Sequence, residues 1–92
     1  MQFYYGQRVR CIDVADGNGS VVGQIGTVRD FTTSYDSEDE LWPGVEFDEE
    51  IENGHSLDDA ETGEAIAWDH GWYCPPKTLI LLEMPIGVDE LI

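Results

Sequence analysis

A chain of 92 residues that is 41% hydrophobic and 11% aromatic can build one folded domain, which excludes a wholly disordered acidic tail. Four Lys and Arg residues stand against twenty Asp and Glu residues, so the formal net charge is −16. Direct binding to nucleic acid or to an anionic membrane is disfavoured, because both need cations to neutralise phosphates. No apolar run reaches the ~18 residues of a membrane-spanning helix, and residues 1–6 lack the basic start of a secretory signal, so we expect a cytoplasmic protein.

The first half of the chain predicts two strands joined by a tight turn. Residues 7–14 alternate with a period of two, which places Val9 and Cys11 on one face of a half-buried strand. The sequence DGNGS at residues 16–20 is rich in residues that accept positive φ, and it predicts a turn. A second strand is expected within residues 21–31, followed by a polar and acidic loop.

The second half predicts three further strands and a long loop. Val45 and Phe47 alternate with polar residues, so both should face the core. Pro75 and Pro76 cannot donate to a β ladder and should end the fourth strand. In chain order we expect a strand at residues 41–48, a loop at 49–63, a short strand or helical turn at 64–68, a strand at 72–74, a 3₁₀ turn at 77–78, a strand at 79–82 and a tail at 83–92.

Five short strands with glycine turns and a proline-containing link before the last strand predict a mostly β, partly open barrel. The sequences GQRVR at residues 6–10 and GQIGTV at 23–28 resemble the opening strands of SH3-like barrels of the KOW and Mind-bomb type. Three later sequences, VEFD, GHS and HGWYCPPKTL, resemble a variant found in small phage and bacterial proteins. The resemblance implies a five-stranded SH3-like domain over residues 1–82 with long acidic loops, followed by the tail. Its motifs are structural, so they indicate fold and hardly function.

Negative charge is concentrated in the middle of the chain. Fifteen carboxylates, beginning with Asp30, lie between Arg29 and Lys77, and no Lys or Arg lies among them. Most fall in two expected loops, at residues 32–40 and 49–64. A net charge of magnitude about 2–8 is sufficient for the solubility of a small domain, so −16 favours a functional reason. A rigid array of carboxylates can imitate the phosphates of a duplex, which carries one charge per ~1.7 Å of axis.

In size, charge and core content the chain is similar to the small acidic DNA mimics that phages direct against restriction, CRISPR or nucleoid proteins. This similarity implies a phage-encoded, non-enzymatic inhibitor in the host cytoplasm, whose partner is a basic host protein that binds nucleic acid, such as a restriction, CRISPR, nucleoid or transcription factor. The predicted partner-binding carboxylates are Asp36, Glu38, Asp39, Glu40, Glu46, Asp48, Glu49, Glu50, Glu52, Asp58, Asp59, Glu61 and Glu64.

Aromatic side chains beside acids offer a second kind of surface. SH3-like barrels often bind peptides through an aromatic groove, and rings next to carboxylates attract Arg and Lys. The alternative hypothesis is therefore an interaction adaptor that uses Trp42, Trp68 and Tyr73. The apolar residues of the tail make a homodimer plausible.

The cysteines and histidines match no known site pattern. Cys11, His55, His70 and Cys74 lack the paired spacing of zinc ligands, and His70 and Cys74 would stand ~13 Å apart on one strand. The oxygen-rich residues 36–40 and 48–54 do not match a calcium-binding loop. His70 and Cys74 match no nucleophile signature either. We expect no metal, cofactor or catalytic residue, and reduced cysteines in the core. A metal- or cysteine-dependent enzyme is the lowest-ranked alternative.

Overall fold

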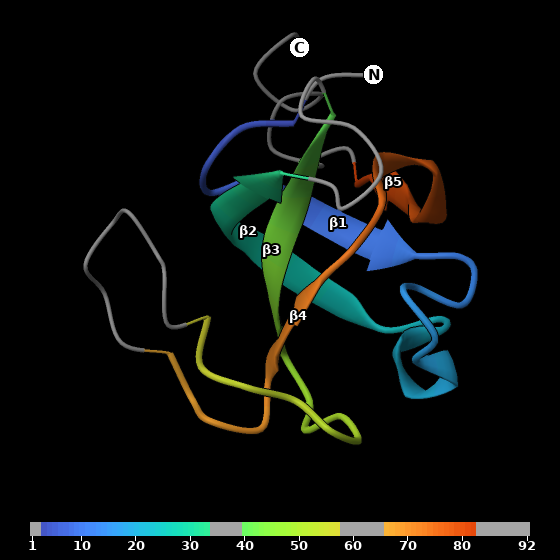
Figure 1. Ribbon diagram of the computed structural model, residues 1–92, viewed down its shortest axis with the longest axis vertical. Coiled ribbons are helices and arrows are strands. Elements are labelled where there is room, and N and C mark those ends of the chain that lie inside the picture. Colours follow the sequence, from blue (N-terminus) through green and yellow to red (C-terminus); the bar gives the residue numbers. More distant parts are fainter. Residues whose placement is uncertain (1–2, 34–39, 58–65, 83–92) are drawn as a thin grey trace, which may run out of the picture.

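The computed structural model describes residues 3–33, 40–57 and 66–82, and this part of the chain forms one antiparallel sheet with two single-turn helices (Figure 1). In chain order the elements are β1 (Arg8–Cys11), the 3₁₀ helix η1 (Gly19–Val21), β2 (Ile25–Thr33), β3 (Leu41–Phe47), β4 (Gly71–Tyr73), the 3₁₀ helix η2 (Pro76–Thr78) and β5 (Leu79–Leu81). Within the described residues, neither helix has the length and apolar character needed to cross a membrane. The tail at 83–92 lies outside the described residues.

The five strands lie in the order β4-β3-β2-β1-β5, and every neighbouring pair is antiparallel. β2 and β3 form the longest ladder, which runs from the pair Gly26–Phe47 to the pair Thr33–Leu41. β4 and β5 lie at opposite edges of the sheet, and no ladder of the described residues joins them. The prediction of a mostly β fold with five strands is confirmed, and the sheet is not a closed barrel.

Period-two alternation explains which strand residues enter the core. Val9 and Cys11 are fully buried while Arg10 between them is exposed, as predicted for the first strand. Val45 and Phe47 are also buried, as predicted for the third. Such alternation follows from the opposite orientation of successive side chains in a strand. The core consists of Phe3, Val9, Cys11, Ala15, Val21, Val28, Val45, Phe47, Ile51, Cys74 and Leu79.

Two elements of the first half differ from the predicted boundaries. β1 ends at Cys11 and not at residue 14, because the backbone N–H of Ile12 donates to the carbonyl of Thr78 (2.7 Å) outside the β1–β2 ladder. Val21 lies in η1 and not in the second strand, because the side chain of Asn18 caps this helical turn. The second strand therefore begins later than predicted and runs further.

The second half follows the prediction more closely. β3 ends one residue before the predicted end, and β4 begins one residue earlier than predicted and ends at Tyr73. A 3₁₀ turn precedes the last strand, as predicted, with Pro76 at its first position. Residues 66–68, the described part of the predicted strand or helical turn, belong to neither.

Candidate partner-binding surface

The acidic turn, which we define as residues 48–54, directly follows β3 at the lower end of the molecule in Figure 1. It presents the exposed residues Asp48, Glu49, Glu50 and Glu52. Ile51 points the other way and is 5% exposed, within the core. A buried isoleucine between exposed acids anchors the turn to the domain, so the carboxylates extend from a fixed backbone.

Polar contacts from η1 hold the far side of the acidic turn. The side-chain amide of Asn18 donates to the carbonyl oxygen of Glu52 (2.7 Å), and the backbone N–H of Glu52 donates to Oγ of Ser20 (3.0 Å). Asn18 Oδ1 in turn accepts from the backbone N–H and the hydroxyl of Ser20, at 2.9 and 2.6 Å. Asn18 is buried, and this satisfied network therefore fixes the backbone at Glu52.

A third support comes from the segment before β4. The backbone N–H of Ile51 donates to the carbonyl of Asp69 (2.9 Å). Gly54 packs so closely on the same peptide group that a Cβ there would lie 2.4 Å from the carbonyl oxygen of Asp69. Only glycine permits this approach. The acidic turn is thus fastened on two sides by segments distant in sequence.

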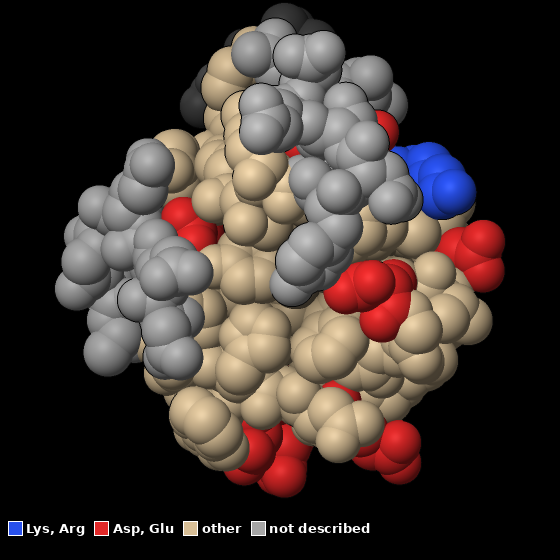
Figure 2. Space-filling view, in the orientation of Figure 1, with Lys and Arg blue, Asp and Glu red and all other residues tan. Residues whose placement is uncertain are grey.

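An open depression of about 600 Å³ lies in the acidic turn, and Glu50, Ile51, Glu52, Asn53 and Asp69 line it. Carboxylates gather along the lower edge of the face in Figure 2, whereas cationic side chains are confined to one corner of that face. The depression and its rim present oxygen atoms to solvent, an arrangement that favours a cationic partner.

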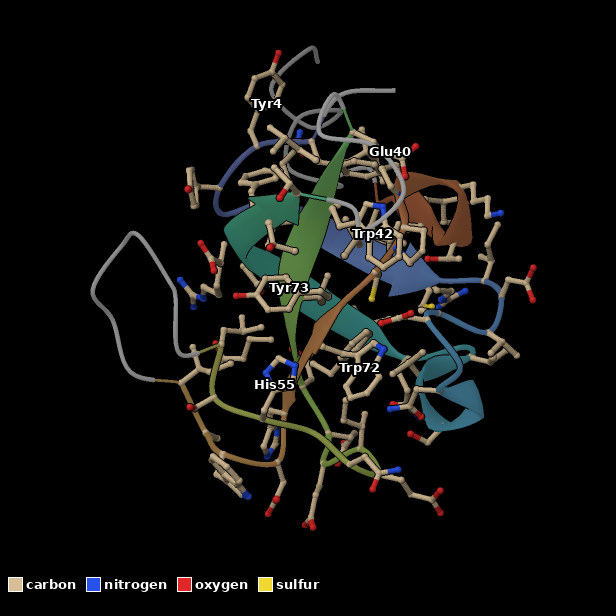
Figure 3. The ribbon with its side chains drawn as sticks, viewed as in Figure 1. Tyr4, Glu40, Trp42, His55, Trp72 and Tyr73 are labelled. Atoms are coloured by element: carbon tan, nitrogen blue, oxygen red, sulfur yellow. The ribbon has the colours of Figure 1, made fainter. Side chains whose placement is uncertain are left out.

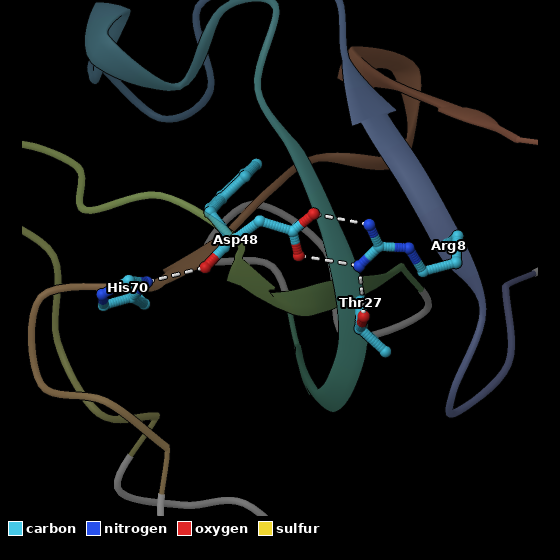
Figure 4. A network of polar contacts seen from close by, with 5 residues as sticks. Arg8, Thr27, Asp48 and His70 are labelled. Atoms are coloured by element: carbon cyan, nitrogen blue, oxygen red, sulfur yellow. Dashed lines mark hydrogen bonds and ion pairs between the residues drawn. The ribbon is translucent and has the colours of Figure 1, made fainter.

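Two of the predicted carboxylates are engaged inside the molecule (Figure 4). Arg8 donates to both oxygens of Asp48, at 2.8 and 2.5 Å, and to Oγ1 of Thr27 at 2.9 Å. The hydrogen bond from Arg8 holds the pKa of Asp48 below its usual value and raises that of Arg8. Arg29 donates to Glu46 at 3.1 Å. These two carboxylates are therefore partly neutralised by internal cations.

The other predicted carboxylates divide into two groups. Glu49, Glu50 and Glu52 lie exposed on the acidic turn, and Glu40 lies near the opposite end of β3, where it accepts a hydrogen bond from the indole of Trp42 (2.5 Å). The remaining predicted carboxylates lie outside the described residues: Asp36, Glu38, Asp39, Asp58, Asp59, Glu61 and Glu64.

The Arg8–Asp48 pair gives a pH prediction. Replacing Asp48 with asparagine should lower the free energy of unfolding by about 0.2–1 kcal/mol near neutral pH, because both partners are partly exposed and solvent screens them. The folded-state pKa of Asp48 is depressed, so this contribution is present above about pH 4 and is lost as the pH falls through that lower pKa. Denaturant unfolding of both proteins between about pH 7 and about pH 2 measures the difference.

Asp13→Asn is the matched control, because an asparagine oxygen can still accept the Val14 N–H that Asp13 now accepts (2.8 Å). It should alter stability little across the same pH range. A wild-type advantage over Asp48→Asn that stays constant or grows on acidification would contradict the assignment.

The three predicted aromatic residues do not form one groove. Trp42 lies near the start of β3 beside Glu40 (Figure 3). Trp68 lies close to the other end of β3, since His70 pairs with Phe47 there. Five residues of strand separate these ends, or roughly 16 Å. Trp68 is 65% exposed and precedes Asp69, so its ring borders the acidic turn.

Tyr73 serves a different purpose from the predicted one. Its hydroxyl donates to Oδ2 of Asp30 at 2.5 Å, and Asp30 is fully buried. Asp30 therefore does not belong to the acidic surface, although it begins the acidic interval of the sequence. Its alternation with buried Val28 was a signal for an inward orientation, but the hydrogen-bond partner that permits burial lies 43 residues away.

The histidines and cysteines separate into different environments. His55 packs on the rings of Trp72 and Tyr73, with centroids 5.5 Å apart in each case (Figure 3). Nδ1 of His70 lies 2.8 Å from the carbonyl oxygen of Phe47 (Figure 4). In the part of the chain that the structure describes, no three His, Cys, Asp or Glu side chains are grouped so that they could hold a metal ion.

Searches of protein-family models, of curated proteins and of solved structures found no match to this chain. The functional argument therefore depends on the geometry above.

Proposed function

We propose that this protein is a non-enzymatic acidic binding protein that occupies the basic, nucleic-acid-binding surface of another protein. One observation carries the proposal: the acidic turn is held rigid by Asn18, Ser20 and the Asp69 carbonyl while its carboxylates are exposed. No Lys or Arg occurs within the turn or between it and Lys77. A fixed set of carboxylates with no cation among them resembles a run of backbone phosphates.

Rigidity matters to such a function because binding orders the groups that make contact. Immobilising a flexible side chain costs about 0.5–1.5 kcal/mol, and a loop that must also be ordered costs more. The backbone of the acidic turn is already fixed before a partner arrives. More of the electrostatic attraction then contributes to affinity, and long-range attraction speeds association.

Three finer features belong to the same proposal. The strand order and the η2 turn before β5 support the resemblance to SH3-like barrels. The compositional similarity to phage DNA mimics makes a host protein that handles nucleic acid the expected partner. The competition takes place in the host cytoplasm, where carboxylates of the acidic turn take the positions of phosphates.

A second candidate function has one observation in its favour. Trp68 is 65% exposed beside the acidic turn, so a Lys or Arg of a partner peptide can contact the ring and a carboxylate together. An adaptor of this kind would depend on the indole more than on the net charge. Trp42 and Tyr73 are already engaged by Glu40 and Asp30, which leaves Trp68 as the principal aromatic contact.

The test is displacement of proteins from DNA. A bacterial lysate is bound to DNA–cellulose, and the purified protein is then added at low ionic strength. Wild type should release a discrete set of DNA-binding proteins, and added salt should weaken its binding to each released protein. The double variant Glu50→Gln and Glu52→Gln should need about fivefold more protein, since two exposed charge contacts amount to about 1 kcal/mol in total.

The matched control removes the same number of charges elsewhere, with Asp13→Asn and Asp16→Asn from the connection between β1 and η1. It should release proteins almost as well as wild type. Equal loss in both double variants would show that net charge alone acts and that the turn is not the contact. Trp68→Ala separates the adaptor: loss of binding there, with the glutamine variant active, would favour the aromatic function and overturn the mimic.

A further inference from the structure

The two cysteines of the chain come together in the core. Cys11 is the last residue of β1 and Cys74 follows β4, so 63 positions separate them in sequence. Both side chains are fully buried and both belong to the same hydrophobic core cluster. The sequence predicted two separate core residues, and nothing in the local pattern indicated that they are neighbours.

Contacts on either side of the pair fix this arrangement. The indole N–H of Trp72 donates to the carbonyl of Ala15 (2.7 Å), which joins the residue two positions before Cys74 to the segment after Cys11. The backbone N–H of Ile12 donates to the carbonyl of Thr78 (2.7 Å), which joins the residue after Cys11 to the turn that follows Cys74. The two thiols therefore lie between two hydrogen bonds that tie the same pair of segments.

We propose that Cys11 and Cys74 form a reversible intramolecular disulfide under oxidising conditions, and that this bond closes the sheet on its open side. The sheet order places β4 at one edge and β1 next to the other edge, and no ladder of the described residues connects them. A covalent link between these cysteines would join β1 directly to the end of β4. The fold thus contains a redox-sensitive staple that its hydrogen-bonded ladders do not supply.

The electronic environment of the pair suits this chemistry. A hydrogen bond from the Cys74 thiol is the main reason that the pKa of Cys11 falls to about 7, while the same contact raises the pKa of Cys74. Cys11 is therefore substantially ionised near neutral pH, and the thiolate is the form that attacks an oxidant. Cys74 stays protonated beside it as the second sulfur.

Hydrogen peroxide is the co-reactant, and the steps balance as follows. The Cys11 thiolate attacks one peroxide oxygen, the O–O bond breaks, and Cys11 becomes a sulfenic acid while the other oxygen leaves as water after protonation. The sulfur of Cys74 then attacks the sulfenic sulfur, the S–O bond breaks, and a second water leaves with the thiol proton of Cys74. Two sulfurs are oxidised and one peroxide is reduced. Burial limits access, so the reaction should be slow.

The experiment treats the whole protein with hydrogen peroxide and measures intact mass, a tryptic map and the melting temperature. The expected product has lost two hydrogen atoms and stays monomeric. Trypsin cuts after Arg10, Arg29 and Lys77, so the bond should link peptide 11–29 to peptide 30–77. Closing a loop of this length should raise Tm by roughly 15 °C or more in the chain-entropy model, and a thiol reductant should reverse the rise.

Two outcomes would overturn the proposal. One is addition of oxygen atoms to either cysteine with no linked peptide, and the other is a linked peptide found only in dimers. The variants Cys11→Ser and Cys74→Ser serve as controls, since each should abolish the peroxide-dependent rise in Tm. The mass and peptide map of wild type decide the question even if a serine variant fails to fold.

Discussion

Replacing Phe47 with alanine is expected to lower the free energy of unfolding by about 3–5 kcal/mol. Phe47 is 1% exposed and ends β3, where its ring enters the core shared by all the longer strands. Its removal takes away apolar area and leaves a cavity that a small sheet cannot fill by collapse. Because small domains are stable by only about 5–15 kcal/mol, urea unfolding should show a large fall in the midpoint.

Ile80→Ala is the control for Phe47→Ala. Ile80 lies in β5 and is 39% exposed, so its truncation should cost a fraction of the loss at Phe47. If both variants lost the same free energy, the sheet would not bury its two faces as described.

Replacing Gly54 with alanine should destabilise the protein by about 1–3 kcal/mol or more and should also displace the acidic turn. The new methyl group would lie 2.4 Å from the carbonyl oxygen of Asp69, and a backbone group cannot rotate away as a flexible side chain can. The Ile51 N–H contact to the same carbonyl should weaken as the segments separate. Amide exchange at Ile51 reports this local change, and thermal unfolding reports the global one.

Gly19→Ala is the matched control, because a Cβ at Gly19 meets no atom within 4 Å. Faster exchange at Ile51 in Gly54→Ala but not in Gly19→Ala would assign the effect to the Asp69 contact. If Gly54→Ala matched wild type in both measurements, the acidic turn would not be held by that contact, and the rigidity on which the proposed function depends would be lost with it.

Local patterns were sufficient for the strands and insufficient for the site. The alternation around Val45 and Phe47 predicted their burial, because a strand sends successive side chains to opposite faces whatever lies beyond it. The proline pair predicted the 3₁₀ turn before β5 for a similarly local reason. In these cases the cause and its effect lie within a few residues of each other.

The features that decide function depend on residues far apart in sequence. Asn18 contacts Glu52 across 34 positions, and Tyr73 contacts Asp30 across 43. The charge count predicted an acidic surface but did not distinguish Asp48, which Arg8 holds, from Glu49, which extends into solvent. Such distinctions arise only when the strands are brought into register.

The hydrogen bonds that hold the acidic turn all act on backbone atoms of the turn. They engage the N–H of Ile51 and the N–H and carbonyl of Glu52, while the side chains at positions 49, 50 and 52 carry no part of that support. The shape of this turn is therefore separable from its chemistry. A library that varies these three positions should yield proteins of nearly wild-type stability with different surface preferences. The barrel-like sheet would then serve as a frame whose displayed residues can be rewritten.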